Sequence, residues 1–381
     1  MNALKAICGL LCLTVLASNL WSMSRWNEAR GVYDDVCYLR QAHLFQRFGL
    51  SGFDTDISRD DGYLTAKLKA IGFPTWNDVT TAPCHNPMQA TGKLVIQYPP
   101  GTGLVMALFP QEHQVIPPYV LATIGVFGFA LLAIVMARTT PSIALAGAFG
   151  CLAIYLMINP SKASYSMAPT MLVCALAGYL TARWLARPQK EQRIWLTMLL
   201  GFLLGLSINF RLPNLFLSAG YFVFFLVSFL SSRKMRLVAQ GALFALAYLA
   251  GMVPTLVANT INAGSPFTTT YAGQDVAAPA LSLGIVWPYL ADLQFVLLAL
   301  GIGGSVYLSR VRAEGARRVA LLTGANLAVN LAFFLSHPVF TPYYTIPIAM
   351  LSLWTLLYAS LMKKAEVVED RLVGEAATAR S

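Results

Sequence analysis

The chain has 381 residues, of which 57% are hydrophobic and 12% charged, and its mean hydropathy is +0.60. This composition excludes an ordinary soluble globular protein, and the lack of two-residue alternation in the apolar runs favours a helical bundle over an outer-membrane barrel. The net charge of +10 lies in short basic clusters between apolar runs, which indicates a membrane protein and not a nucleic-acid-binding surface.

The first apolar run extends from Leu4 to Trp21 and has a lysine near its start and small residues near its end. These features also occur in cleaved signal peptides, whose hydrophobic region is short. Trp21 and Trp26 are instead typical of residues that anchor a helix at the membrane interface. We predict that residues 1–23 form a first transmembrane helix, and a cleaved signal peptide stays open as the alternative.

Residues 24–112 form the long polar region of the chain and hold the largest share of its acidic residues. From Asp34 to Phe48, apolar and polar residues recur at helical spacing, which predicts an amphipathic helix lying along the membrane interface. A second short helix is predicted from Tyr63 to Ile71. Pro99-Pro100-Gly101 then opens an apolar run that is too short to cross a bilayer, and we predict a bent interfacial segment there.

Nine further apolar runs follow the polar region, and we interpret each as a membrane span. They are Val115–Ala137, Ser142–Ile158, Met167–Ala182, Ile194–Phe210, Leu212–Leu230, Leu237–Val257, Leu283–Leu308, Val319–Leu335 and Thr345–Met362. Together with the first helix they predict an all-α, polytopic membrane helical bundle of about ten spans. Residues 113–362 are then the multi-span bundle, and residues 363–381 a polar tail.

Basic residues gather in alternate short loops between these predicted spans. They are Arg138, then Arg183, Arg187, Lys190 and Arg193, then Arg233, Lys234 and Arg236, then Arg310, Arg312, Arg317 and Arg318. Because short loops rich in Lys and Arg stay in the cytoplasm, these loops and the C-terminus are predicted to be cytoplasmic and the 24–112 region to lie outside. The outer loops contain no Asn-x-Ser/Thr acceptor site, which favours a bacterial plasma (inner) membrane.

Two cysteines, Cys37 and Cys84, lie in the polar region. Outside the cytoplasm they would form either a disulfide or two unpaired thiols, and the sequence does not choose between these. Asp54 to Gly62 resembles a calcium loop only faintly, because Arg59 stands where the turn glycine belongs and Thr65 where the last glutamate belongs. The histidines show no metal-ligand spacing, so no metal site is predicted.

Adjacent carboxylates, Asp34 and Asp35, follow the first predicted helix. Ionisable residues at a membrane edge are costly to place and are often functional for that reason. A carboxylate would act as general base on an acceptor hydroxyl, and nearby cations would hold a phosphate, which together describe transfer from a lipid-phosphate donor. The ionisable residues predicted on this side are Asp34, Asp35, Lys93, Lys162, Arg211, Asp275 and His337.

Several of these residues also have a purely structural interpretation. The two aspartates would begin a helix, where acidic side chains suit the positive end of the helix dipole. Lys162 and Arg211 would extend to the outer interface. His337, which precedes a proline, would be an ordinary loop residue.

This arrangement resembles GT-C-type membrane glycosyltransferases, particularly the branch that holds the protein O-mannosyltransferases and the aminoarabinose transferase of lipid A. Those proteins carry an acidic pair and an aromatic residue after the first span, matched here by Asp34-Asp35 and Tyr38. Their Pro-Pro element is matched by Tyr98-Pro99-Pro100-Gly101-Thr102-Gly103, and an outer-loop run by Asn262-Ala263-Gly264-Ser265-Pro266-Phe267. Their final outer loop often reads Arg-Tyr, whereas here Pro342 precedes Tyr343-Tyr344.

The resemblance implies a GT-C-like fold, a polyprenyl-phosphate-linked sugar as donor, and inverting transfer at the outer face to a lipid, glycan or protein acceptor. It implies that Asp34 is the general base and that Asp35 orients Asp34 or the acceptor. Because Pro342 replaces the arginine, Arg211 or His337 would contact the donor phosphate. The predicted substrate-binding residues are Tyr38, Lys93, Tyr98, Arg211, Asn262, His337 and Tyr343.

The other expected partners are membrane lipids, with no nucleic acid. No cofactor is predicted beyond the lipid-phosphate sugar, and dependence on a divalent metal is left open. The alternative function is a lipid or glycan transporter or flippase, which predicts internal repeats and helices broken near the bilayer midplane. No convincing repeat is present, and the polar residues cluster at one face. A membrane scaffold that binds a partner through its large loop is a third interpretation.

Overall fold

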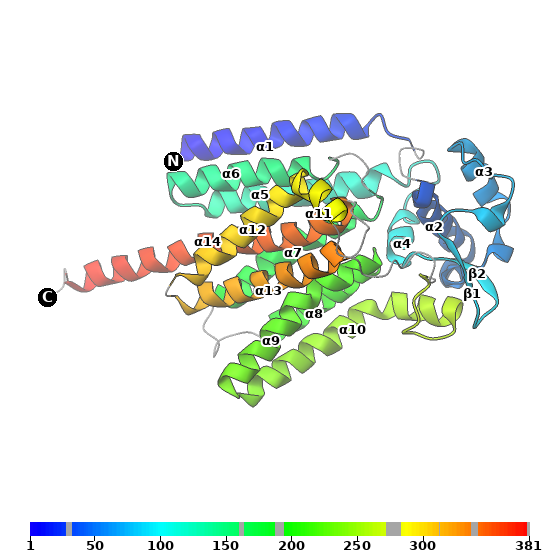
Figure 1. The fold of residues 1–381 in the computed structure, drawn as a ribbon. Helices are drawn as coiled ribbons and strands as arrows, with labels where there is room; N and C mark the ends of the chain where they lie inside the picture. Colours follow the sequence, from blue (N-terminus) through cyan, green and yellow to red (C-terminus); the bar gives the residue numbers. More distant parts are fainter. Residues whose placement is uncertain are drawn as a thin grey trace.

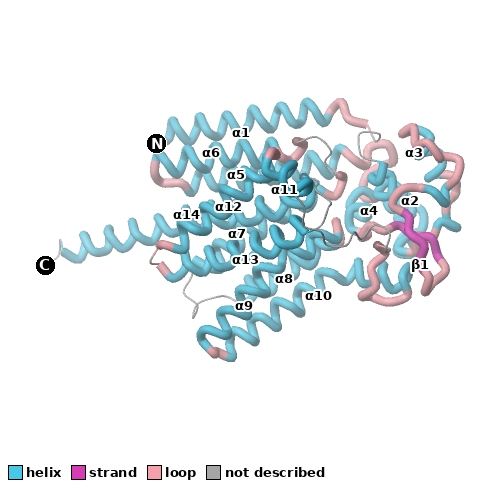
Figure 2. Tube along the Cα trace, viewed as in Figure 1, coloured by secondary structure: helices cyan, strands magenta, loops and turns pink. Residues whose placement is uncertain are grey.

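The computed structural model describes residues 1–27, 33–159, 164–186, 194–271, 283–311, 313–336 and 342–378. Helices account for 77% of the structure and strands for 2%, so the all-α fold class is confirmed. Figure 1 shows a bundle of long helices with a compact lobe at one end. We call residues 33–109 the lobe. Figure 2 shows that the described strands are confined to it.

The lobe consists of short helices, 3-10 turns and a two-stranded antiparallel sheet. Its elements are η2 (Tyr33–Asp35), α2 (Val36–Phe48), η3 (Gly49–Phe53), η4 (Ile57–Arg59), α3 (Tyr63–Ala70), η5 (Val79–Thr81), β1 (His85–Met88), β2 (Lys93–Ile96) and α4 (Gly101–Met106). The short helix predicted from Tyr63 to Ile71 is therefore confirmed as α3, and the apolar run after Pro99-Pro100 begins with the short helix α4.

Helix α2 lies at the centre of the lobe. Nine of its thirteen residues are buried, Arg40 and Gln41 among them. The helix predicted over this stretch is therefore confirmed, and its position along a membrane interface stays a prediction. The helix packs against α3, α4 and η3, and the close approach of η3 requires Gly52, whose missing Cβ would meet the backbone of Leu44 at 2.8 Å. A disulfide between Cys37 and Cys84 joins α2 to the segment before β1.

The bundle contains the remaining described helices. They are α1 (Asn2–Met23), α5 (Ile116–Met136), α6 (Thr140–Tyr155), α7 (Met167–Ala186), α8 (Ile194–Ile208), η7 (Leu212–Ser218), α9 (Ala219–Ser232), α10 (Met235–Ala263), α11 (Leu283–Leu290), α12 (Leu293–Ser309), α13 (Glu314–Ser336) and α14 (Pro342–Thr378). One apolar core joins α1, α5, α6, α7 and α14, and a second joins α7, α8, α9, α10 and α13. Helix α7 therefore links the two halves of the bundle.

Helices α8 and α10 pack closely and run in the same direction. A Cβ at Gly205 would overlap the backbone carbonyl of Tyr248, so only glycine permits this approach. At the lobe end of the pair, the Asn209 side chain donates to the carbonyl of Gly251 at 2.8 Å and accepts from the Thr255 amide at 2.9 Å. The pair is thus joined by apolar contact along its length and by hydrogen bonds at one end.

Five described segments are long and apolar enough to cross a membrane, which supports a helical membrane protein but not ten spans. They are Asn2–Met23, Ile116–Met136, Leu212–Ser232, Met235–Ala263 and Tyr344–Met362. Helices α6, α8 and α12 are apolar but only 15 to 17 residues long, below the ~20 residues of a typical span. The predicted span from Leu283 to Leu308 is broken, because α11 ends at Leu290 and Asp292 caps a new helix.

Candidate functional site

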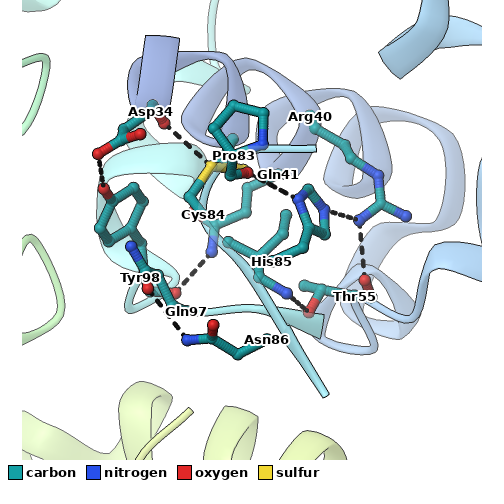
Figure 3. Close-up of a disulfide and its surroundings, with 12 residues drawn as sticks. Asp34, Arg40, Gln41, Thr55, Pro83, Cys84, His85, Asn86, Gln97 and Tyr98 are labelled. Carbon is teal, nitrogen blue, oxygen red and sulfur yellow. Dashed lines mark hydrogen bonds between the residues drawn. A yellow bond between two sulfur atoms is a disulfide. The ribbon is translucent and has the colours of Figure 1, made fainter. Parts of the chain in front are cut away.

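Asp34 lies where the lobe meets the bundle, in the short turn η2 that precedes α2. Its side chain is half-buried, and its carboxylate accepts a hydrogen bond from the hydroxyl of Tyr98 at 3.0 Å. Figure 3 shows this bond beside the disulfide. A carboxylate that is partly exposed and held by one donor keeps oxygen lone pairs with which to receive a further proton.

Asp35 has a different environment although it is the next residue. Its side chain is only 2% exposed, and its carboxylate accepts hydrogen bonds from the Ser164 hydroxyl at 2.9 Å and the Tyr165 amide at 3.2 Å. Tyr119 of α5 in turn donates its hydroxyl to the carbonyl of Ser164 at 2.8 Å. Asp35 therefore fastens the start of α2 to the segment that leads into α7.

The rings of three tyrosines pack one against the next beside Asp34. The rings of Tyr38 and Tyr98 stack with centroids 4.8 Å apart, and Tyr271 meets the Tyr98 ring edge-on at 6.0 Å. Burial raises the pKa of all three phenols well above the usual value. The Tyr98 hydroxyl therefore keeps its proton and acts as the donor to Asp34.

Arg211 brings a cation to the same group of residues. It precedes η7 and is 5% exposed; its guanidinium carbon lies 5.1 Å from the centroid of the Tyr344 ring, and Nη1 lies 2.9 Å from the sulfur of Met167. The charge of Arg211 opposes the rise in the pKa of both Tyr38 and Tyr271, which indicates that these side chains lie near it. We call Asp34, Tyr38, Tyr98, Arg211, Tyr271 and Tyr344 the junction cluster.

The Pro-Pro-Gly element holds Tyr98 in this cluster. The side chain of Gln41 donates to the Tyr98 carbonyl at 2.8 Å, and the amide of Gly101 donates to the Asn209 carbonyl at 2.6 Å. Gly101 is required here, because a Cβ would lie 2.7 Å from the Asn209 carbonyl oxygen. The hydroxyl of Thr102 donates to the Phe210 carbonyl at 3.0 Å. The element therefore connects α2 to the chain that leads into Arg211.

Lys93 and Asn262 lie together at another contact between lobe and bundle. The ammonium group of Lys93 pairs with Asp54 at 3.1 Å and donates to the carbonyl of Ile261, also at 3.1 Å. The Asn262 amide donates to the Phe53 carbonyl at 2.8 Å and accepts from the amide of Thr55 at 3.0 Å. Both residues therefore fasten the lobe to the end of α10.

Two predicted site residues, His337 and Tyr343, have side chains that the structure does not describe. His337 lies outside the described residues, as do Lys162 and Asp275. Tyr343 lies in the first turn of α14, and its side chain is not described. Its neighbour Tyr344 supplies the ring beneath Arg211.

Sequence reasoning did not single out Tyr271, Tyr344 and Ser164 as site residues. A motif argument could have predicted Tyr344, because the Tyr343-Tyr344 pair stands where GT-C-type proteins often have the tyrosine of their final outer loop. Tyr271 carried only the weak signal of an aromatic residue in an outer loop. Ser164 gave no signal, because a serine after an apolar run is typical of many loops and its partner is 129 residues away.

A buried histidine lies next to the disulfide. The ring of His85 donates from Nδ1 to the Pro83 carbonyl at 2.9 Å, and Nε2 accepts from the Arg40 guanidinium at 2.9 Å (Figure 3). Burial, and then the charge of Arg40, lower the pKa of His85 to about 3, so the ring is neutral at neutral pH.

The ligand atoms of Cys37, Cys84 and His85 lie within 4.8 Å of one another, close enough to hold a metal ion. The two sulfurs are bonded to each other, however, and a metal would need them as thiolates. The trio fits a structural disulfide beside a neutral histidine, and it does not fit a metal site while the disulfide is intact.

Comparisons with protein-family models, with curated proteins and with solved structures find no match to this chain. The functional interpretation therefore depends on the geometry of the junction cluster and on the sequence motifs that lead into it.

Proposed function

We propose that this protein is a membrane glycosyltransferase that moves a sugar from a polyprenyl-phosphate donor to a hydroxyl group on a lipid, glycan or protein at the outer face of a bacterial plasma membrane. The observation that carries the proposal is the half-buried carboxylate of Asp34, bonded to Tyr98 in the same cluster as the buried Arg211. Transfer from a lipid phosphate requires a base for the acceptor and a cation for the leaving phosphate, and the cluster contains one of each.

In the proposed reaction, an acceptor oxygen attacks the anomeric carbon of the sugar. Asp34 takes the proton of the acceptor hydroxyl as the new carbon–oxygen bond forms. The bond between the anomeric carbon and the phosphate oxygen breaks, and the polyprenyl phosphate leaves with that electron pair. Attack from the face opposite the leaving group inverts the anomeric carbon.

The two neighbouring aspartates have separate roles in this proposal. Asp34 is the base, because it is partly exposed and has the Tyr98 hydroxyl to orient it. Asp35 is a positioning residue, because it is buried and bonded to Ser164 and Tyr165. Arg211 meets the negative charge on the leaving phosphate, with Tyr344 supporting its guanidinium.

The test uses purified protein in lipid nanodiscs, a panel of radiolabelled polyprenyl-phosphate sugars, and a membrane extract as the acceptor source. Asp34→Asn should lower label transfer by about 10²–10⁴-fold, the usual contribution of a general base. Glu112→Gln, which changes an exposed carboxylate outside the cluster, should transfer label like the wild type. Transfer that survives Asp34→Asn refutes the assignment of the base. Movement of labelled lipid across vesicle membranes without any transfer would favour the transporter.

A further inference from the structure

An apolar groove opens at the side of the bundle, between α6, α12 and α14. Its volume is about 390 Å³, and all but one of its lining residues are apolar or aromatic. Ligand sites commonly have volumes of ~300–1,000 Å³. The groove does not include any residue of the junction cluster.

The shape of the groove follows from the residues on its three helices. Leu353 and Leu357 of α14 are buried and form its floor. The walls are half open, since Leu145 of α6 is 56% exposed and Leu300 of α12 is 53% exposed. The groove stays open because the residues at these wall positions are small, Ala148 on α6 and Gly304 on α12. Larger side chains there would fill the groove. The groove therefore faces whatever surrounds the bundle.

Each of the three helices is apolar over its lined stretch. Helix α14 is a candidate span from Tyr344 to Met362, and α6 and α12 are shorter apolar helices. On α12 the lining runs from Leu300 to Leu308, about 12 Å at the helical rise of ~1.5 Å per residue. A narrow apolar trough of this length in a membrane-embedded surface suits a hydrocarbon chain, which has no polar group to satisfy.

Two arginine side chains lie towards one end of the groove. Arg310 caps α12 two residues after the lining residue Leu308, and Arg138 lies two residues before the start of α6; both side chains are exposed. Tyr307, at the same end, is 70% exposed and has the ring-and-hydroxyl chemistry of residues that settle at the headgroup level. The described carboxylate nearest in sequence, Glu314, begins α13, which does not line the groove.

We propose that this groove is a binding site for one anionic phospholipid, whose acyl chain lies against α14 and whose headgroup phosphate is held by Arg138 and Arg310. Basic residues between helices at a membrane surface favour anionic headgroups by about 1 kcal/mol each. The charged end selects the headgroup, and the apolar trough holds the chain. The site lies apart from Asp34 and does not depend on glycosyl transfer.

The test uses the full-length protein, delipidated in detergent and titrated with 1-palmitoyl-2-oleoyl phosphatidylglycerol or the matching phosphatidylcholine. Bound lipid is counted by native mass spectrometry. The wild type should bind one phosphatidylglycerol in preference to phosphatidylcholine. Because two arginines contribute, Arg138→Gln with Arg310→Gln should reduce that preference by about 5- to 30-fold and leave phosphatidylcholine binding unchanged.

A second variant tests the groove itself. Ala148→Phe places a ring in the trough at an exposed position, so the fold should tolerate it, and it should weaken binding of both lipids at least tenfold. Ala250→Phe, at an exposed alanine of α10 that does not line the groove, is the matched control and should bind like the wild type. Equal binding of the two lipids by the wild type overturns the headgroup assignment, and unchanged binding by Ala148→Phe overturns the groove.

Discussion

Removal of the disulfide should loosen the lobe without unfolding the bundle. The bond between Cys37 and Cys84 spans 47 residues of sequence. The loop-closure relation for a loop of that size gives about 4 kcal/mol of stabilisation, as an upper value. Because both cysteines are buried, alanine at these positions leaves only small cavities, and the lost cross-link should account for most of the effect.

The assay is native-state hydrogen exchange measured by mass spectrometry on peptides from β1 and β2. A loss of about 4 kcal/mol corresponds to exchange up to ~10³-fold faster in a Cys37→Ala, Cys84→Ala variant, at ~1.4 kcal/mol per tenfold. Reductant should speed exchange in the wild type and have no further effect on the variant. Cys174→Ala, which removes a free buried thiol of α7, should leave these peptides protected. Exchange of β1 and β2 that changes less than threefold in the double variant refutes the reasoning.

Three further predictions concern single residues. The folded pKa of His85, about 3, lies below its unfolded value of ~6.5. Between these two pH values the unfolded state binds more protons than the folded state. The stability of the lobe should therefore fall as the pH drops from about 6.5 towards 3, measured by the same exchange experiment. Asn209→Ala leaves the Thr255 amide without its side-chain acceptor and should cost about 1–3 kcal/mol, seen as a lower thermal midpoint in detergent. Tyr98→Phe keeps the ring stack but removes the donor to Asp34. The kcat for label transfer should fall about tenfold with KM unchanged, whereas an unchanged kcat contradicts a positioning role.

Some of the residues predicted from the sequence lie together in the structure, and others lie apart from them. Asp34, Tyr38, Tyr98 and Arg211 were all predicted to be site residues, and they lie in one cluster. Two of these residues belong to motifs whose spacing constrains the backbone. Asp34 lies in η2 just before α2, and Tyr98 lies three residues before Gly101, which must fit against Asn209. A constraint on backbone geometry can be read from a short motif because the residues that impose it are adjacent in the chain.

Lys93 was predicted to be a site residue because an ionisable side chain at a membrane edge is costly, and Asn262 because it begins an outer-loop run that resembles the family's. Neither argument names a partner. Their partners are Asp54 and two lobe backbone groups, which only the tertiary structure supplies. The ten-span prediction failed for a related reason. A hydropathy window finds an apolar run but does not give the length of the helix that forms there, so α6, α8 and α12, which are only 15 to 17 residues long, were counted as spans.

The fastening of the lobe has a consequence for the order in which the protein folds. The ribosome makes the lobe early, yet the partners of Asp35 are synthesised about 130 residues later and that of Thr55 207 residues later. The lobe must therefore leave the ribosome with its bundle-facing groups unsatisfied and wait until α10 is complete. A chain that stops before α8 should contain α2 and the disulfide but remain open to proteases at η3 and β2, whereas a chain that extends past Asn262 should protect them.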